Sequence, residues 1–219
     1  MAEDIERLAG YQEDSAKQLE QISDTLANGI WVRDASPNLG ANASRRVPKL
    51  STADELVLFS ACSCSLKSDD VFIMTTDLAQ EMGAQALSEK EFWDSVEFLA
   101  HLGLIGNVAM LSATLALFKI TPQGFEYYGS QNIDGFDVIL RDALLYLARF
   151  PWEDEEDRPS NQSISTGLGI PISLTNCVLD ILTARGWIRT VAFLGGQTEV
   201  TQVTVVGKRA AQLMKVGEG

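Results

Sequence analysis

The stretch that decides the fold runs from Gly103-Leu104-Ile105 to Thr121-Pro122-Gln123-Gly124. The same frame returns 83 positions later as Gly186-Trp187-Ile188 and Thr204-Val205-Val206-Gly207. The 16 positions from isoleucine to threonine are the same in both segments, with no insertion. Two copies of one supersecondary unit explain this spacing, as they do in repeat proteins generally.

Each copy predicts the same order of elements around this frame: a helix, a short helix, a third helix, a β-hairpin and a closing helix. In the first copy we expect a first helix from Ser51 or Thr52, with Glu55 completing a capping box, and a third helix opened by the capping box of Ser88 and Glu91. Between these helices we expect an extended piece at 71–74 and a short helix at 76–82. A hairpin over 104–120 and a helix over 122–128 follow the third helix. In the second copy we expect a helix from 137, a short helix over 160–168, a third helix opened by Ser173 or Thr175, a hairpin over 188–206 and a closing helix over 207–216. The fold class is therefore mainly α with small β-hairpins (α+β).

The N-terminal part differs in character from the two copies. Residues 3–29 predict a helix whose apolar positions fit a heptad, interrupted by polar Gln12 and Ser15; these positions are Ile5, Leu8, Leu19, Ile22 and Leu26. Such a helix either forms a homodimer or packs on its own domain, and both interpretations stay open. The domains are thus 1–50, the N-terminal helix and linker, then 51–134 and 135–219.

This arrangement resembles a winged helix-turn-helix occurring twice. The run of a hydrophobic helix, Gly-Leu-Ile or Gly-Trp-Ile, a hairpin and Thr-x-x-Gly is similar to the MarR and PadR groups of bacterial regulators. It covers about residues 51–129 and 135–216. Two copies in one chain also resemble tandem winged-helix adaptors, such as the kleisin-partner subunits of bacterial condensin and the ESCRT-II subunits. The resemblance implies the fold more than a function.

Charge separates the two copies. The chain carries a net charge of −13, and residues 51–134 contribute −9 of it, from three basic and twelve acidic residues. DNA phosphates repel such a surface, so the first copy is expected to contact a protein, which would be basic. The predicted partner-binding residues are the outward carboxylates of its third helix and the apolar hairpin tip, namely Glu89, Glu91, Asp94, Glu97, Met110, Leu111 and Leu115. The acidic run 152–157 in the second copy is a further candidate. We therefore predict a non-enzymatic adaptor or regulatory subunit that acts through protein contacts.

The second copy leaves an alternative open. Its third helix carries uncharged polar residues and ends in arginines, and its last helix is basic, so a dimer of this chain could read DNA as a transcriptional regulator. The residues this alternative uses are Ser173, Thr175, Asn176, Arg185, Arg189, Lys208 and Arg209, with Asn176 suited to an adenine edge.

Catalytic and metal-binding patterns are lacking in the sequence. His101 is the only histidine and is expected to lie partly buried at a helix end. The Cys62-Ser63-Cys64 spacing does not suit zinc, and no glycine-rich loop lies between a strand and a helix. We expect no enzymatic activity, no cofactor and no metal. Glycines and Asn107 interrupt the uncharged stretch 98–118, and the chain opens without a signal peptide, so we expect a cytoplasmic protein that does not enter a membrane.

Overall fold

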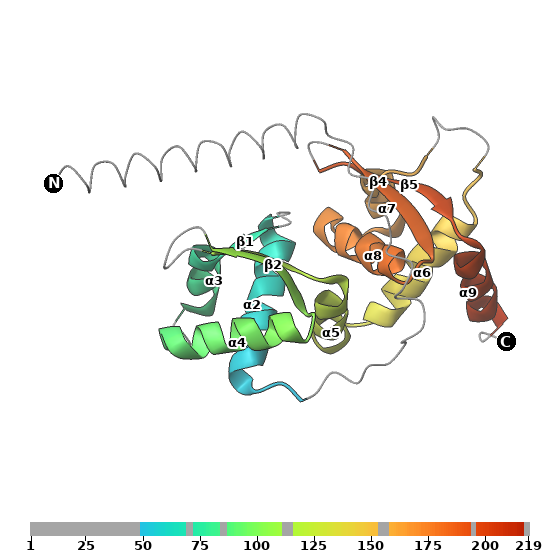
Figure 1. The fold of residues 1–219 in the computed structure, drawn as a ribbon. Helices are drawn as coiled ribbons and strands as arrows, with labels where there is room; N and C mark the ends of the chain where they lie inside the picture. Colours follow the sequence, from blue (N-terminus) through green and yellow to red (C-terminus); the bar gives the residue numbers. More distant parts are fainter. Residues whose placement is uncertain are drawn as a thin grey trace.

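The computed structural model describes residues 49–68, 72–83, 87–110, 116–152, 158–193 and 196–216. In this part of the chain, eight helices and five short strands form two adjacent units, one from each half of the sequence (Figure 1). The structure is thus α+β and mainly helical, as predicted. The expected helix over 3–29 and the acidic run 153–157 lie outside the described residues.

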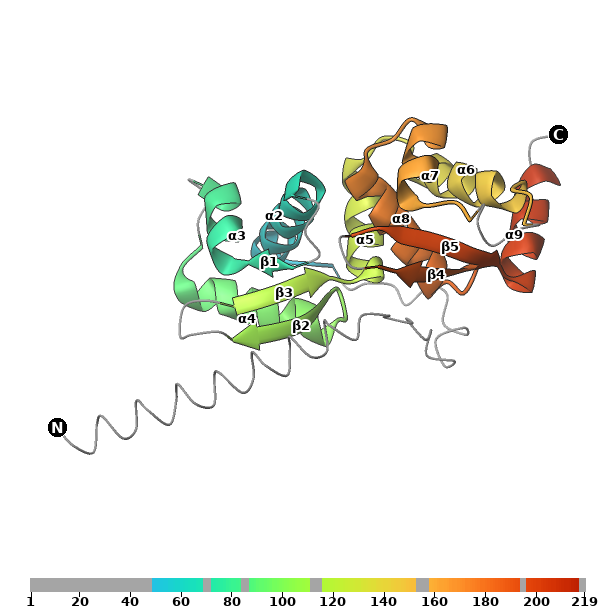
Figure 2. The ribbon, with the colours of Figure 1, turned by 90° about the horizontal axis from the view of Figure 1, so that it is seen from above.

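The first unit has its helices on one side of a small sheet (Figure 2). The sheet is antiparallel with the strand order β1-β3-β2, so the hairpin β2–β3 is extended by the two-residue strand β1. In chain order the elements are α2 (Thr52–Ser68), β1 (Ile73–Met74), α3 (Thr75–Met82), α4 (Glu89–His101), β2 (Ile105–Met110), β3 (Ala116–Ile120) and α5 (Pro122–Asn132).

The second unit has the same order but only the two-stranded sheet β4–β5, to which Ser160 adds a single bridge at Glu199. Its elements are α6 (Phe136–Ala148), α7 (Asn161–Leu168), α8 (Ile172–Ala184), β4 (Ile188–Ala192), β5 (Thr198–Val203) and α9 (Val205–Val216).

The structure confirms the internal repeat at the level of individual pairs. α4 and α8 both have 13 residues, and their first residues are 83 positions apart. Ile105 pairs with Ile120 in the first hairpin, and Ile188 pairs with Val203 in the second, again 83 positions apart. Each ladder becomes irregular after the next pair, at Gly106 and at Arg189. We call the two units the first and the second repeat.

The Thr-x-x-Gly step ties each closing helix to the start of its hairpin. The Oγ1 atom of Thr121 donates to the carbonyl of Gly103 at 2.6 Å and accepts from the backbone N–H of Gly124 at 3.0 Å. Thr204 repeats both bonds, to the carbonyl of Gly186 at 2.7 Å and from the N–H of Gly207 at 3.0 Å. The threonine is therefore a helix N-cap and a cross-link to the preceding corner at once.

Glycine is required at two kinds of position in this frame. Gly103 and Gly186 have φ angles of 73° and 68°, which residues with a Cβ rarely adopt. Gly124 and Gly207 serve a different purpose, since a Cβ there would lie 2.1 Å from the carbonyl oxygen of Leu104 or Trp187. The backbone geometry of the fold therefore explains why glycine recurs at these positions of the sequence.

Some of the helix starts predicted from the sequence are observed in the structure, and others are not. Ser88 and Glu91 form the expected capping box at α4. At α2 the expected pair of Thr52 and Glu55 is wrong, because Ser51 and Asp54 exchange these hydrogen bonds instead.

The expected start of α8 at Ser173 or Thr175 is also wrong. The helix begins at Ile172, with Pro171 as the preceding residue. The φ angle of Pro171 is −57°, within the range that its ring imposes, and no side chain caps this helix start.

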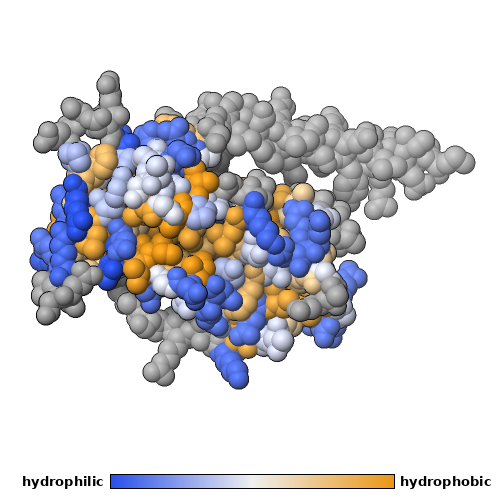
Figure 3. All heavy atoms as spheres, turned by 180° about the vertical axis from the view of Figure 1, so that it is seen from behind, coloured by the Kyte–Doolittle hydropathy of each residue, from blue (hydrophilic) through white to orange (hydrophobic). Residues whose placement is uncertain are grey.

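The two repeats share one continuous hydrophobic core. Helices α2 and α5 of the first repeat pack against α8 of the second. At the edge of this junction Arg185 donates to a carboxylate oxygen of Glu126 at 2.8 Å and lies over the ring of Trp187, 4.7 Å from its centroid. Seen from behind, hydrophobic residues gather over the middle of the molecule and hydrophilic ones toward its ends (Figure 3).

Cys62 of α2 lies inside this core. Burial raises the pKa of its thiol well above the ordinary value, and Cys177 of α8 adds to the shift. Cys62 therefore stays neutral and packs as a small apolar side chain.

Within the described ranges, no single helix has the length and apolar character of a membrane span. Only α7 and α8 taken together reach them, and these two helices are bent by 109°.

A polar cluster between α2 and α3 makes the stability of the first repeat depend on pH. Lys67 donates to the Glu81 carboxylate at 2.7 Å, and Ser63 donates to it at 2.8 Å. These hydrogen bonds, with that of Lys67 the larger, lower the pKa of Glu81 in the folded chain. The unfolded chain therefore takes up this proton first, so the stabilisation is present above about pH 4.3 and is lost as pH falls through the folded pKa.

We expect Lys67→Met to make the loss of stability between about pH 5 and pH 3 shallower, because the pKa of Glu81 then returns toward its ordinary value. Urea unfolding at a series of pH values measures the slope. Lys119→Met, in strand β3 and outside this cluster, serves as the control and should keep the original slope. An identical slope in Lys67→Met and in the parent chain would contradict the assignment.

Candidate interaction surfaces

The outer face of α4 is acidic, as the sequence predicts. The helix buries Ser95, Val96 and Leu99 toward the core. Leu99 follows Val96 by three positions and Ser95 by four, so the three residues lie on one side of the helix and the opposite side faces solvent. The exposed residues there are Glu89, Lys90, Glu91, Asp94, Glu97, Phe98 and His101. We call this set the α4 face.

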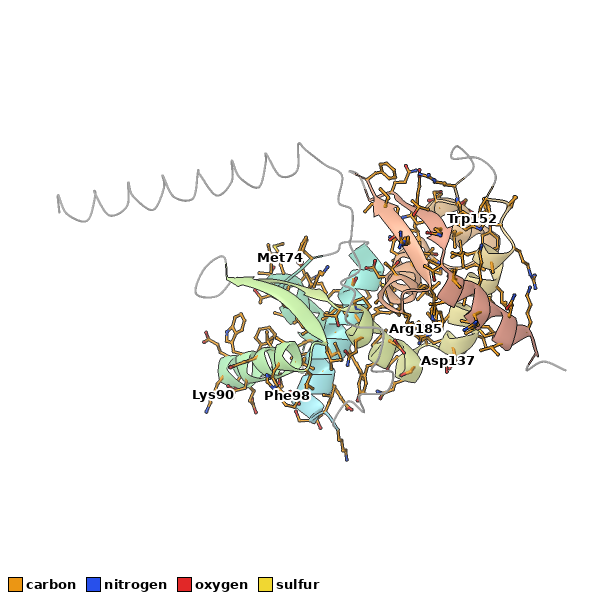
Figure 4. The ribbon with its side chains drawn as sticks, turned by 45° about the vertical axis from the view of Figure 1, so that its right-hand side comes forward. Met74, Lys90, Phe98, Asp137, Trp152 and Arg185 are labelled. Atoms are coloured by element: carbon orange, nitrogen blue, oxygen red, sulfur yellow. The ribbon has the colours of Figure 1, made fainter. Side chains whose placement is uncertain are left out.

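One residue of the α4 face, Phe98, was not identified from the sequence, and the burial expected for another, His101, is wrong. Phe98 is 39% exposed among the carboxylates, and sequence reasoning missed it because its position fits the edge of the buried stripe. His101 was expected to be partly buried but is exposed. Figure 4 shows Lys90 and Phe98 on the outer side of this helix.

The electrostatics of the α4 face keep it negative. Four carboxylates stand against one lysine. Hydrogen bonds from the side chain and then the backbone of Ser88 lower the pKa of Glu91, so Glu91 is ionised at neutral pH. Glu89 and Glu91 lie in the first turn, where the helix dipole favours negative charge. The α4 face can therefore attract a cationic group without losing its own charge.

The hairpin beside α4 is described only in part. The backbone of Met110 pairs with Ala116 in the β2–β3 ladder. The side chain of Met110, and the residues Leu111 and Leu115, lie outside the described part of the chain. The apolar hairpin tip therefore stays a prediction.

The corresponding helix of the second repeat, α8, is enclosed. Among its residues only Ala184 is exposed. Ser173 is 8% exposed and Thr175 is fully buried, so the expectation that they face outward is wrong. The reason is tertiary: α2 and α5 cover one side of α8 while α6, α7 and β4 cover the others. The Thr175 hydroxyl donates to the carbonyl of Pro171 at 3.0 Å, which lets this polar side chain be buried.

Asn176 also has a structural partner in place of a ligand. Its Oδ1 atom accepts from Nδ2 of Asn161 at 2.7 Å, and the same Nδ2 donates to the carbonyl of Gly196 at 3.0 Å. Asn161 is 3% exposed, so this bridge links α7, α8 and the hairpin turn inside the fold. The Oδ1 atom of Asn176 is therefore already engaged within the fold, and its role at a base edge stays a prediction.

The basic residues that the DNA-binding alternative uses come from three parts of the second repeat. Arg185 is held at the junction with the first repeat by Glu126 (Figure 4), a pairing 59 positions apart that no local pattern predicts. Arg189 is exposed on β4, while Lys208 and Arg209 are exposed on α9. Of these four residues, Arg185 is engaged by Glu126 and the other three are exposed.

Comparison of the chain with protein-family models, curated proteins and solved structures finds no match.

Proposed function

We propose that this chain is a tandem winged-helix protein that acts without enzymatic activity, as an adaptor or regulatory subunit binding a basic protein partner. The order of helix, short helix, helix, hairpin and helix in both repeats supports the winged-helix assignment. In that assignment α4 and α8 are the third, recognition helices of the two repeats.

The observation that carries the proposal is the contrast between these two helices. α8 is covered on nearly all sides, whereas α4 exposes four carboxylates and Phe98. A carboxylate facing DNA would weaken binding, because DNA phosphates repel it. The same carboxylates would attract a helix or loop rich in lysine and arginine, and Phe98 offers an apolar contact on the same helix.

An 18-residue amphipathic peptide of lysine and leucine tests this proposal on the full chain by titration calorimetry. We expect binding at low ionic strength that weakens with added salt. Asp94→Lys with Glu97→Lys should weaken it at least about tenfold, since both substitutions reverse charges on the α4 face. Asp134→Lys with Asp137→Lys makes the same change in net charge at exposed positions outside α4, and this control should change affinity far less.

Two outcomes would contradict the proposal. Equal losses in the two double variants would mean that the peptide responds to net charge and not to the α4 face. Tighter binding of a random-sequence DNA duplex than of the peptide, with a steep dependence on salt, would favour a DNA-binding regulator.

A further inference from the structure

In the described part of the chain, one apolar face of helix α9 is exposed. Gly207 and Ala211 turn toward the core, and α9 packs on α6. On the outer side Val205, Val206 and Leu213 are 78%, 60% and 70% exposed, the largest values among the described large hydrophobic residues. Val206 and Leu213 are seven positions apart and so lie on the same side of the helix. One exposed valine needs no explanation, but three such residues on a single helix indicate a contact surface.

The same helix is the basic element of an acidic chain. Residues 205–216 include Lys208, Arg209 and Lys215 and no carboxylate, whereas the whole chain has a net charge of −13. Lys208 and Lys215 are seven positions apart and form a row along the helix, and Arg209 lies between Val206 and Leu213 in the helical order. A complementary partner presents leucine-like side chains at heptad spacing together with carboxylates.

One segment of this chain has that composition. Residues 3–29 contain seven acidic and two basic residues, a net charge of −5, and carry isoleucine and leucine at heptad positions. The α4 face is also acidic, but it exposes a single large hydrophobic residue, Phe98, and lies at the opposite end of the molecule from α9 (Figures 1 and 2). Residues 3–29 therefore complement both the exposed hydrophobic residues and the basic residues of α9. The α4 face complements only the basic residues.

We propose that residues 3–29 bind the outer face of α9 in the same copy of the chain. Their isoleucine and leucine side chains cover Val206 and Leu213, and their carboxylates pair with Lys208, Arg209 and Lys215. The 20 residues from 30 to 49 span up to about 70 Å when extended. This distance is large compared with the dimensions of a protein of 219 residues. A tether of this kind holds the segment at an effective concentration on the order of millimolar, which favours the same copy over a second one. This contact is separate from the α4 face and does not depend on the proposed function.

Carbodiimide cross-linking of the full chain, followed by peptide mass spectrometry, tests the contact. This reagent adds no spacer, so it forms an amide only between an amine and a carboxylate that come into direct contact. We expect cross-links from Lys208 or Lys215 to carboxylates within residues 3–29. The pair Lys67–Glu81, 2.7 Å apart, is an internal control that must cross-link in the same sample. An equal mixture of ordinary and nitrogen-15-labelled chain distinguishes links within a copy from links between copies.

Variants show whether the apolar row contributes. Val206→Ser with Leu213→Ser should reduce these cross-links several-fold while Lys67–Glu81 is unchanged. Both residues are exposed, so the substitutions leave the core intact. Phe72→Ser removes a hydrophobic residue that is 53% exposed in the first repeat and should change nothing. Absence of the cross-links in a sample that forms Lys67–Glu81, or their formation only between labelled and unlabelled copies, overturns the proposal.

Discussion

Gly207→Ala is expected to destabilise the chain by about 3 kcal/mol, although alanine favours a helix over glycine by about 1 kcal/mol. The added Cβ would lie 2.1 Å from the carbonyl oxygen of Trp187, and the nearby carbon atoms of that residue are backbone as well. No side chain can rotate away to make room. The closing helix α9 must move off the start of strand β4, and this movement breaks the bonds of Thr204 to the corner at Gly186.

Gly124→Ala should behave in the same way in the first repeat, because its Cβ would meet the carbonyl oxygen of Leu104 at 2.1 Å. Urea unfolding of the full chain measures both effects as a shift of the transition midpoint. Gln131→Ala in α5 and Gln212→Ala in α9 are matched controls at exposed positions of the same two helices. They should change the stability by less than about 0.5 kcal/mol. A Gly207→Ala variant as stable as the parent chain would show that the two backbones do not approach this closely.

Asn161→Ala is expected to cost about 2 to 3 kcal/mol, the second large effect. The Asn161 side chain donates to Asn176 and to the carbonyl of Gly196, and its Oδ1 atom accepts from the N–H of Gln162 at 3.0 Å. Alanine removes all three bonds at a position where the side chain of Asn161 is 3% exposed. Each lost bond is worth about 1 kcal/mol, so the three together account for the expected loss.

A double-mutant cycle with Asn176→Ala isolates the direct pair. We expect the two substitutions together to cost less than the sum of their separate costs, by about 1 kcal/mol, because either one already breaks the 2.7 Å bond. Gln162→Ala, the neighbouring exposed residue of α7, is the control and should be close to neutral. Strict additivity of Asn161→Ala and Asn176→Ala would count against a structural role for Asn176.

The two repeats show how one scaffold can serve different contacts. Both keep the glycine corner, the threonine cap and the close approach of the closing helix. Their third helices differ in what surrounds them: α4 faces solvent with its carboxylates, and α8 is enclosed by helices of both repeats. The inter-repeat packing therefore removes one of the two surfaces that the repeated sequence suggests.

The sequence by itself determined the repeat, the order of elements and the acidic side of α4. These features depend on interactions between residues close in sequence or on spacings that a local pattern preserves. Ser88 and Glu91 are three positions apart, and the corner at Gly103 has a positive φ that glycine adopts without strain. The carboxylates of α4 alternate with a buried stripe in the same helix, so their exposure follows from helical period alone.

Only the tertiary structure decided that α8 is buried. Polar residues such as Ser173, Thr175 and Asn176 look exposed in a sequence, because burying a hydroxyl or amide is unfavourable unless a partner satisfies it. Here the partners are the carbonyl of Pro171 for Thr175 and Asn161 for Asn176, while α2 and α5, more than 40 positions earlier in the chain, provide the cover. Hydrophobic periodicity shows which residues favour burial, but it cannot show which distant helix packs over a polar face, and that packing sets which surface of this protein remains free to bind.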